Sequence, residues 1–353
     1  MSARRALVGL ALGLGLAGML AGCGGAAGGS GSAGGESVWP ASGSRTFSPY
    51  VDVTLASPFD LAGVATDTGA RSLTLAFVTA RAGGCQAAWG GMTAIDAPTI
   101  AGPAARLRKA GVALRVSFGG AQGVELAGRC PDTGLLEAAY ASVLDRYHAV
   151  VADFDLEGAA LADRAAMMRR AQAIARLQAR SGRALAVSLT VPASPKGLSA
   201  AALTAVRAMV TAGVRLSAVN LLAMDYGTAV PLGRMGAAAI AAVSSAHRQL
   251  VRLRGGLSGW GVLGVSAMVG VNDTPGEVFT LKDAEQLASF AGRHGLGLVS
   301  IWSLARDHSC AGSVRGAADP TCSGVNAPPY AFSQAFGAYP RPGVAPARAM
   351  DSS

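Results

Sequence analysis

Three acidic residues at alternate positions give the most specific chemical signal in the sequence. Asp153, Asp155 and Glu157 end the run 149–158, whose first half is apolar. In a strand, side chains alternate between two faces, so the three carboxyl groups point to one side. Carboxylates this close repel one another, and burying them is unfavourable unless they share protons or partners. The pattern favours acid–base catalysis; a metal site or a solvated strand end is the alternative.

The hydrophobic pattern predicts the elements that position this acidic run. From Pro49 onward, short apolar runs rich in β-formers alternate with helical runs rich in Ala and Leu. The expected strands are Tyr50–Leu55, Ser72–Val78, Ala113–Phe118, Ala149–Leu156, Ala184–Thr190, Ala218–Met224, Gly264–Val269 and Leu298–Trp302. The expected helices include Ala104–Ala110, Leu135–Tyr147, Leu161–Ala179, Ala200–Ala212, Ala237–Leu253 and Leu281–His294.

Roughly eight strands, mostly separated by helices, in about 290 residues match the size of a (β/α)8 barrel. We therefore predict an α/β fold of the TIM-barrel class. A doubly wound open sheet is the alternative, and it would carry a Gly-rich phosphate loop after its first strand. The sequence has Ser57-Pro58-Phe59-Asp60 at that place.

Unusual residues stand where several expected strands end, which is where a barrel has its active site. The third strand ends in Ser117-Phe118-Gly119-Gly120. The sixth leads into Met224-Asp225-Tyr226-Gly227, and the seventh into a loop with Asn272 and Asp273. The eighth ends at Trp302.

Together these stretches resemble glycoside hydrolase family 18, which comprises chitinases and endo-β-N-acetylglucosaminidases. Residues 153–158 resemble the end of its Asp-x-x-Asp-x-Asp-x-Glu signature, with Val150 in place of the first Asp. Residues 117–120 are similar to its Ser-x-Gly-Gly element. Residues 224–227 resemble the Met-Asp-Tyr-Gly variant of some bacterial chitinases, where many members have Met-x-Tyr-Asp.

The resemblance implies substrate-assisted hydrolysis with retention of anomeric configuration, a stated exception to the two-carboxylate scheme. Glu157 would protonate the glycosidic oxygen and later activate water. Asp155 would hold the acetamido N–H of the sugar, with Asp153 behind it. Tyr226 or Asp225 would orient the acetamido carbonyl. No metal or organic cofactor is implied.

The same resemblance assigns residues to the substrate cleft. Trp302 would form the floor on which a sugar stacks, the alternative being a core tryptophan that plugs the barrel. Ser117 would hydrogen-bond an inner carboxylate. Further cleft residues by this resemblance are Tyr50, Phe77, Trp89, Met224 and Asn272.

The stretch between Val271 and the last expected strand is only about two dozen residues long, enough for one helix. Family members with deep clefts carry an extra α+β insertion there. We therefore expect a barrel without this insertion, a shallow open groove and endo-type cleavage.

The N-terminal residues have the pattern of an export signal. Arg4 and Arg5 precede an apolar stretch from Ala6 to Leu20, and Leu20-Ala21-Gly22-Cys23 resembles a bacterial lipobox. This implies a lipid on Cys23 and an extracytoplasmic, membrane-anchored protein; an ordinary secretory peptide is the alternative.

The expected domains follow from these patterns: signal peptide 1–22, a Gly/Ser/Ala-rich linker 23–44, the catalytic domain 45–339 and a disordered tail 340–353.

The remaining cysteines are even in number, which argues for disulfides in an exported chain. They are Cys85, Cys130, Cys310 and Cys322. Four cysteines allow three connectivities, of which we expect the local pairs, 85 with 130 and 310 with 322. Zinc ligation is the weaker alternative, because no Cys-x-x-Cys spacing occurs.

The composition of the chain argues against nucleic acid as a binding partner. The formal net charge is +9, but no Lys/Arg block interleaved with aromatics suggests nucleic acid. We expect the basic balance to reflect composition and solubility, and the protein to be a monomer that binds chitin or chitooligosaccharides. Two other functions stay open: an endo-β-N-acetylglucosaminidase acting on N-glycans, and a chitin-binding lectin on a silent barrel.

Overall fold

The computed structural model describes residues 45–55, 61–181, 185–227, 230–253, 257–311 and 317–339. The expected signal peptide, Cys23, the linker up to residue 44 and the tail from residue 340 lie outside this part of the chain.

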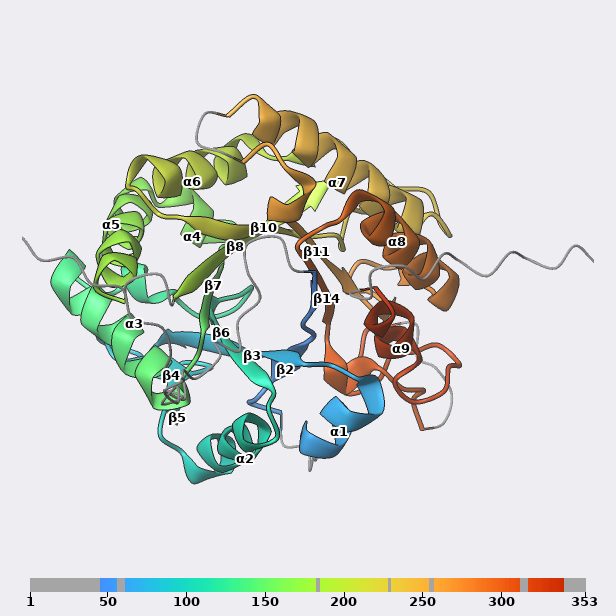
Figure 1. The fold of residues 1–353 in the computed structure, drawn as a ribbon, viewed down its shortest axis with the longest axis horizontal. Coiled ribbons are helices and arrows are strands. Elements are labelled where there is room, and N and C mark those ends of the chain that lie inside the picture. Colours follow the sequence, from blue (N-terminus) through green and yellow to red (C-terminus); the bar gives the residue numbers. More distant parts are fainter. Residues whose placement is uncertain are drawn as a thin grey trace, which may run out of the picture. The chain divides into compact units, whose positions relative to one another are not determined.

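Parallel strands form a ring that closes on itself, as Figure 1 shows. In the order in which they pair, the strands are β3 (Ser72–Ala80), β6 (Ala113–Gly119), β7 (Val151–Asp155), β8 (Ala186–Ser194), β10 (Leu216–Leu222), β11 (Leu263–Met268) and β14 (Leu298–Trp302). The predicted α/β barrel and its eight strand positions are confirmed.

The eighth position of the ring is a strand broken at two residues, Ser48 and Pro49. β1 (Thr46–Phe47) pairs with β14, and β2 (Tyr50–Asp52) pairs with β3. Pro49 lies between them and has no N–H to donate to a neighbouring strand. Its carbonyl instead accepts the N–H of Thr74 at 3.0 Å. The first strand therefore switches partners at the proline and so closes the ring.

Helices cover the outside of the ring (Figure 1). They are α1 (Leu61–Thr68), α2 (Pro98–Lys109), α3 (Thr133–Tyr147), α4 (Gly158–Ala162), α5 (Arg164–Arg180), α6 (Ala200–Thr211), α7 (Met235–Val251), α8 (Leu281–His294) and α9 (Ala331–Gly337). Asp132, Ser199 and Thr280 cap the N-termini of α3, α6 and α8, because each side chain accepts a backbone N–H of the first turn.

One expected helix is divided in two. Asp163 separates α4 from α5, since its backbone is extended and its side chain accepts the N–H of Ala166. An Asp that can cap a helix thus starts a new one inside a run that reads as continuous. The sequence also missed the short strands β4 (Ala87–Trp89), β5 (Thr93–Ala94), β9 (Gly197–Leu198), β12 (Gly270–Val271) and β13 (Val278–Phe279).

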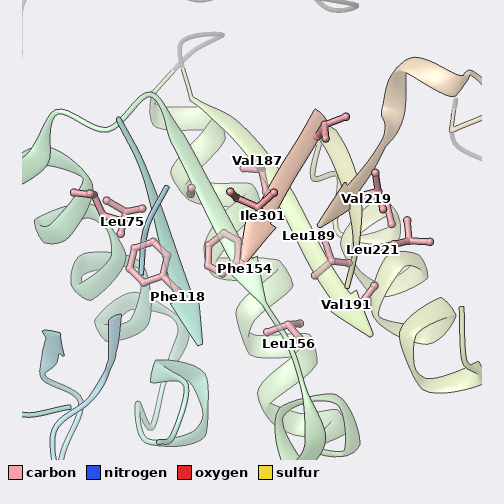
Figure 2. Packing of buried hydrophobic residues seen from close by; sticks show 14 of the residues in the cluster. Leu75, Phe118, Phe154, Leu156, Val187, Leu189, Val191, Val219, Leu221 and Ile301 are labelled. Atoms are coloured by element: carbon pink, nitrogen blue, oxygen red, sulfur yellow. The ribbon is translucent and has the colours of Figure 1, made fainter. Parts of the chain in front are cut away.

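The main core lies between the sheet and the helices. Figure 2 shows Phe118 and Phe154 side by side on adjacent strands, and their rings stack with centroids 5.3 Å apart. Tyr140 of α3 packs edge-on against both rings, at 4.9 and 5.1 Å. Aromatic packing therefore holds the outward face of the acidic strand against β6 and α3.

A buried ion pair fastens the loop that follows β6 to two helices. Glu125 accepts hydrogen bonds from Tyr140 of α3 and from Nε of Arg170 of α5, the latter at 2.9 Å. It also caps the short 3₁₀ turn Leu126–Gly128. Glu125 and Arg170 are both buried, so each depends on the other for compensation of its charge.

Two disulfides confirm the expected local pairing. Cys85 bonds to Cys130, and Cys310 bonds to Cys322. The zinc alternative for these four cysteines is therefore wrong.

The predicted absence of an α+β insertion is confirmed for residues 257–311. A two-stranded hairpin, β12 and β13, follows β11 and leads directly into α8.

Among the described residues, no helix combines the length and apolarity needed to cross a bilayer. Nor do any three His, Cys, Asp or Glu side chains in that part of the chain form a group that could hold a metal ion.

Replacing Arg170 by Met should destabilise the fold by about 3–5 kcal/mol, because Glu125 would stay buried without its cation. Arg176→Met, an exposed position on the same helix, is the matched control and should change stability by no more than about 0.5 kcal/mol. Urea unfolding of both variants measures the difference. Equal loss in the two variants would show that the ion pair contributes nothing specific.

Candidate active site

The predicted catalytic residues gather at the carboxyl ends of the strands. Asp155 is the last residue of β7, and Glu157 follows two residues later. Trp302 is the last residue of β14, and Asp225 lies in the loop after β10. In a (β/α)8 barrel this is the end that carries the active site.

Asp153 lies inside the barrel within a cage of hydroxyl groups. Its Oδ2 accepts from Tyr50 at 2.9 Å and from Ser117 at 2.7 Å. Its Oδ1 accepts from Thr190 at 2.8 Å and from Ser188. Four donors to one fully buried carboxyl group are the partners that a buried anion requires.

Strand register explains how residues distant in sequence build this cage. Ser117 of β6 and Ser188 of β8 both stand directly opposite Asp153 of β7. The polar layer extends around the interior, where the Asn220 amide donates to Thr190 at 3.1 Å and to Ser266 at 2.8 Å. The guanidinium of Arg115 lies 4.0 Å from Asp153 and donates to Ser188.

Asp155 is the incompletely satisfied member of the acidic group. It is buried, and its Oδ1 has no hydrogen-bond partner among the described residues. Burial raises the pKa of Asp155 well above its ordinary value, and the nearby carboxylates of Glu157 and then Asp153 raise it further. The result is a carboxyl group that can share a proton and has one buried oxygen without a hydrogen-bond partner among the described residues.

Glu157 is half-buried, and its pKa is also raised. Burial raises its pKa, and the negative charge of Asp225 adds to the shift. Asp225 itself is exposed, and its Oδ1 accepts the backbone N–H of Thr274 at 2.8 Å. A glutamate with a raised pKa beside other carboxylates suits a general acid.

Two glycines allow β6 to approach the acidic strand. Gly119 has φ +104°, and a Cβ there would collide with the backbone oxygen of Asp155. Gly120, at φ +87°, donates its N–H to the same oxygen at 3.0 Å. A Cβ at Gly120 would lie only 2.7 Å from the Phe77 ring. The Gly-Gly element thus passes directly beside the acidic strand.

An aromatic cluster adjoins the acids. Trp302 stacks on Phe77 at 5.3 Å, and Tyr50 lies 6.1 Å from Trp302 and 6.0 Å from Phe77. The Ala76–Phe77 and Trp302–Ser303 peptide bonds are both cis. Phe77 and Trp302 are half-buried, so part of each ring stays available to a ligand. Because the Tyr50 hydroxyl binds Asp153, this cluster and the acids are joined by one side chain.

Three of the predicted cleft residues do not face a cleft. Tyr50 is 2% exposed, and its hydroxyl is used in binding Asp153 inside the barrel. Trp89 is fully buried on β4, and its Nε1 donates to the Tyr147 hydroxyl at 2.9 Å, so it is a core residue that cannot stack on a sugar here. Asn272 is 1% exposed, and its amide donates to the carbonyls of Met268 and Gly270. It shapes the turn into β12 and does not face a ligand.

Met224 and Tyr226 are half-buried in the loop after β10. The Tyr226 hydroxyl has no hydrogen-bond partner within the described residues. Burial raises the pKa of Tyr226, and the charge of Glu277 raises it further. The hydroxyl is therefore held neutral, in the form that can donate to a ligand.

Sequence reasoning missed two buried charged residues near these loops. Burial raises the pKa of Glu277 and the charge of Asp225 adds to the shift, which nearby backbone N–H groups of Tyr226, Gly227 and Asp225 offset only in part. Arg306 is buried and donates to the carbonyls of Val269, at 3.0 Å, and Val271. A charged residue soon after the last strand was the available signal for Arg306, whereas the sequence around Glu277 has no distinctive pattern.

A closed (β/α)8 barrel with a row of carboxyl groups and a tryptophan at its carboxyl-end mouth has the general form of a carbohydrate-active hydrolase. No family model matches the chain. It is, however, 33% identical over 318 residues to a probable bifunctional chitinase/lysozyme of Escherichia coli, covering 85% of this chain and 35% of that protein. It is also 33% identical over 287 residues to endochitinase 11 of Metarhizium anisopliae, covering 77% of this chain and 54% of the relative.

Solved structures that resemble this chain are chitinases as well. The catalytic domain of a hyperthermophilic chitinase from Pyrococcus furiosus superimposes with a TM-score of 0.75 at 30% identity, covering 84% of this chain and 95% of that one. A GH18 chitinase from Pseudoalteromonas aurantia shares the fold, with a TM-score of 0.55 at 16% identity and coverage of 73% and 94%. The chain belongs to the family 18 chitinases. It spans about a third and about half of the two curated relatives that it matches.

Neutralising the two inner acids should change stability in opposite directions. The raised pKa of Asp155 means that the unfolded chain, with a pKa near 3.9, loses this proton first as pH rises. Asp155 therefore lowers stability increasingly above about pH 4, at up to about 1.4 kcal/mol per pH unit, until pH passes its folded pKa. Asp155→Asn should be more stable than wild type at pH 7, and the gap should shrink at pH 4.

Asp153→Asn, by contrast, should lose at least about 2 kcal/mol at pH 7, because four donors lose a charged acceptor. Thermal unfolding of both variants across pH 4 to 8 tests the pair. The interpretation would be wrong if Asp155→Asn were destabilising at pH 7 or if Asp153→Asn were neutral.

Proposed function

We propose that this protein is a chitinase that hydrolyses β-1,4-linked N-acetylglucosamine with retention of anomeric configuration. The observation that carries the proposal is the gradient of environments along one acidic strand. Asp153 is fully partnered, Asp155 has an oxygen without a hydrogen-bond partner among the described residues, and Glu157 has a raised pKa. The names of the relatives support the substrate, and a Pyrococcus furiosus chitinase domain 30% identical to this chain has been solved with chito-oligosaccharides.

The chain's own residues suit each step. Glu157 gives its proton to the glycosidic oxygen as the bond to the anomeric carbon breaks. The acetamido oxygen of the same sugar attacks that carbon and forms an oxazolinium ion, while Asp155 accepts a hydrogen bond from the acetamido N–H. Glu157 then removes a proton from water, which opens the ring and restores the acid. The neutral hydroxyl of Tyr226 donates a hydrogen bond to the acetamido carbonyl oxygen and so orients it.

Asp153 and the aromatic cluster act behind these steps. The hydroxyl cage holds the Asp153 carboxyl group in place, and the proximity of Asp153 contributes to the raised pKa of Asp155. The exposed part of the Trp302 ring gives the apolar face of the sugar a surface to stack on.

Glu157→Gln should lower kcat on chitin oligosaccharides by about a thousandfold while leaving KM nearly unchanged, because the amide keeps the shape and cannot donate the proton. Parallel assays on a high-mannose glycopeptide distinguish the alternatives. Cleavage of the glycopeptide alone would show an endo-β-N-acetylglucosaminidase. Binding of oligosaccharides without turnover by wild type would show a lectin.

Endo action and retention are tested with two further measurements on the wild type. The open groove without the α+β insertion favours internal cuts, so the viscosity of a soluble chitin derivative should fall early in its digestion. Viscosity loss that lags behind the release of reducing ends would contradict endo cleavage. ¹H NMR during the first turnovers should show the β-anomer as the initial product, and an initial α-anomer would exclude retention.

We also propose that the mature protein is monomeric and works outside the cytoplasm. The apolar residues 6–20 and the lipobox-like segment ending at Cys23 support a lipid anchor.

A further inference from the structure

Positive charge gathers at the amino ends of the barrel strands, opposite the catalytic mouth. We call this end the basal rim and define it by the last turns of the helices and by the loops that lead from them into strands. Its exposed cations include Arg71, Lys109, Arg146, Arg207, Arg252 and Arg293. Two acids, Asp67 and Asp145, are exposed in the same helix ends. The basal rim therefore carries a clear excess of positive charge.

These cations are not neutralised by neighbouring acids. The described residues form three salt bridges, Arg115–Asp153, Arg170–Glu125 and Arg180–Glu137, and none of them includes the six rim cations. The helix dipole favours cations in a last turn, but Arg71 lies in a loop immediately before β3 and Arg252 lies just past α7. The dipole alone does not account for the cluster.

The opposite rim has a mixed charge. Exposed Lys196, Arg234 and Lys282 lie there among acids such as Asp225 and Asp273. Charge is thus segregated along the barrel axis, which a net charge of +9 could not reveal. The expectation that the basic balance only reflects composition and solubility has to be revised for this reason.

The basal rim also has a groove whose size and side chains suit a phosphodiester group. It lies between the ends of α6 and α7, has a volume of about 330 Å³, and is lined by Arg207, Val210, Thr211, Arg252 and Leu253. Two guanidinium groups and a hydroxyl can bind the oxygens of a phosphodiester, and the apolar residues can contact its organic part.

The path of the chain favours a bilayer as the source of that phosphate. The described part of the domain begins at this rim, with Arg45 directly before β1. The 44 residues that precede Arg45 include the apolar stretch 6–20 and the lipobox-like Cys23. A lipid at Cys23 would bring phospholipid headgroups to the same end of the barrel that carries the unpaired cations.

We propose that the basal rim binds the anionic phospholipid surface of the membrane and so turns the catalytic mouth away from it. Each arginine or lysine near such a surface strengthens binding about fivefold at moderate salt, so three together contribute about a hundredfold. A lipid chain alone holds a protein weakly, and a basic patch is the second contact that makes attachment stable.

The test uses the full chain with Cys23→Ser, which removes the lipid acceptor in every arm. Its partition is compared between vesicles of phosphatidylcholine and vesicles containing phosphatidylglycerol. The basal variant carries Arg71→Gln, Arg207→Gln and Arg252→Gln. The matched control carries Lys196→Gln, Arg234→Gln and Lys282→Gln, which removes the same charge from the opposite rim. The residues 6–20 are common to all, so the ratio of the two partitions isolates the charge effect.

We expect preference for phosphatidylglycerol to fall about a hundredfold in the basal variant and less than threefold in the control, with unchanged thermal unfolding in both. Equal losses in the two variants would show a net-charge effect and overturn the proposal, as would no preference in the parent. If soluble polyphosphate at the same phosphate concentration displaced the protein from the phosphatidylglycerol vesicles, the basal rim would be a site for soluble polyanions, and the membrane proposal would be overturned. Chitin hydrolysis enters none of these readouts, so the outcome is separate from the catalytic proposal.

Discussion

Asp153 accepts hydrogen bonds from four hydroxyl groups that come from three other strands of the barrel. Tyr50, Ser117, Ser188 and Thr190 can meet there only if the registers of β6, β7 and β8 are correct and the ring is closed at β2. A buried carboxylate that lacked these donors would be strongly unfavourable. The cage thus couples the geometry of the catalytic end to the correct assembly of the whole sheet.

The other two acids have different environments from Asp153 because they lie at different positions along the chain. Asp155 lies one pleat nearer the mouth of the barrel and has one oxygen without a hydrogen-bond partner among the described residues. The carboxylates of Glu157 and Asp153 raise its pKa. Glu157 lies beyond the end of the strand and is only half-buried, and the charge of Asp225 raises its pKa. Three carboxyl groups of nearly the same chemistry therefore lie in three different environments, because burial and hydrogen bonding change along the strand.

The strands and the acidic trio could be predicted because both depend on short-range periodicity, which the sequence displays directly. The hydroxyl cage could also have been found: Ser188 and Thr190 alternate with Val187, Leu189 and Val191, the pattern of a strand whose inner face is polar. Trp89 was misplaced because its depth depends on the β3–β4 pairing and on Tyr147 of α3, which are contacts between distant residues. Glu277 was missed for the same reason, since its surroundings are set by residues 225–227 of another loop.

The closure of the ring by its first and last strands affects how the chain reaches this state. Thr46 and Phe47 pair with Leu298 and Val299, so the pairing joins segments about 250 residues apart. A loop of that length closes late, after local βα units have formed. During synthesis the N-terminal segment must wait for the final strand to emerge, and until then both edges of the sheet stay unpaired. During that time the exposed edges need protection from pairing with other chains.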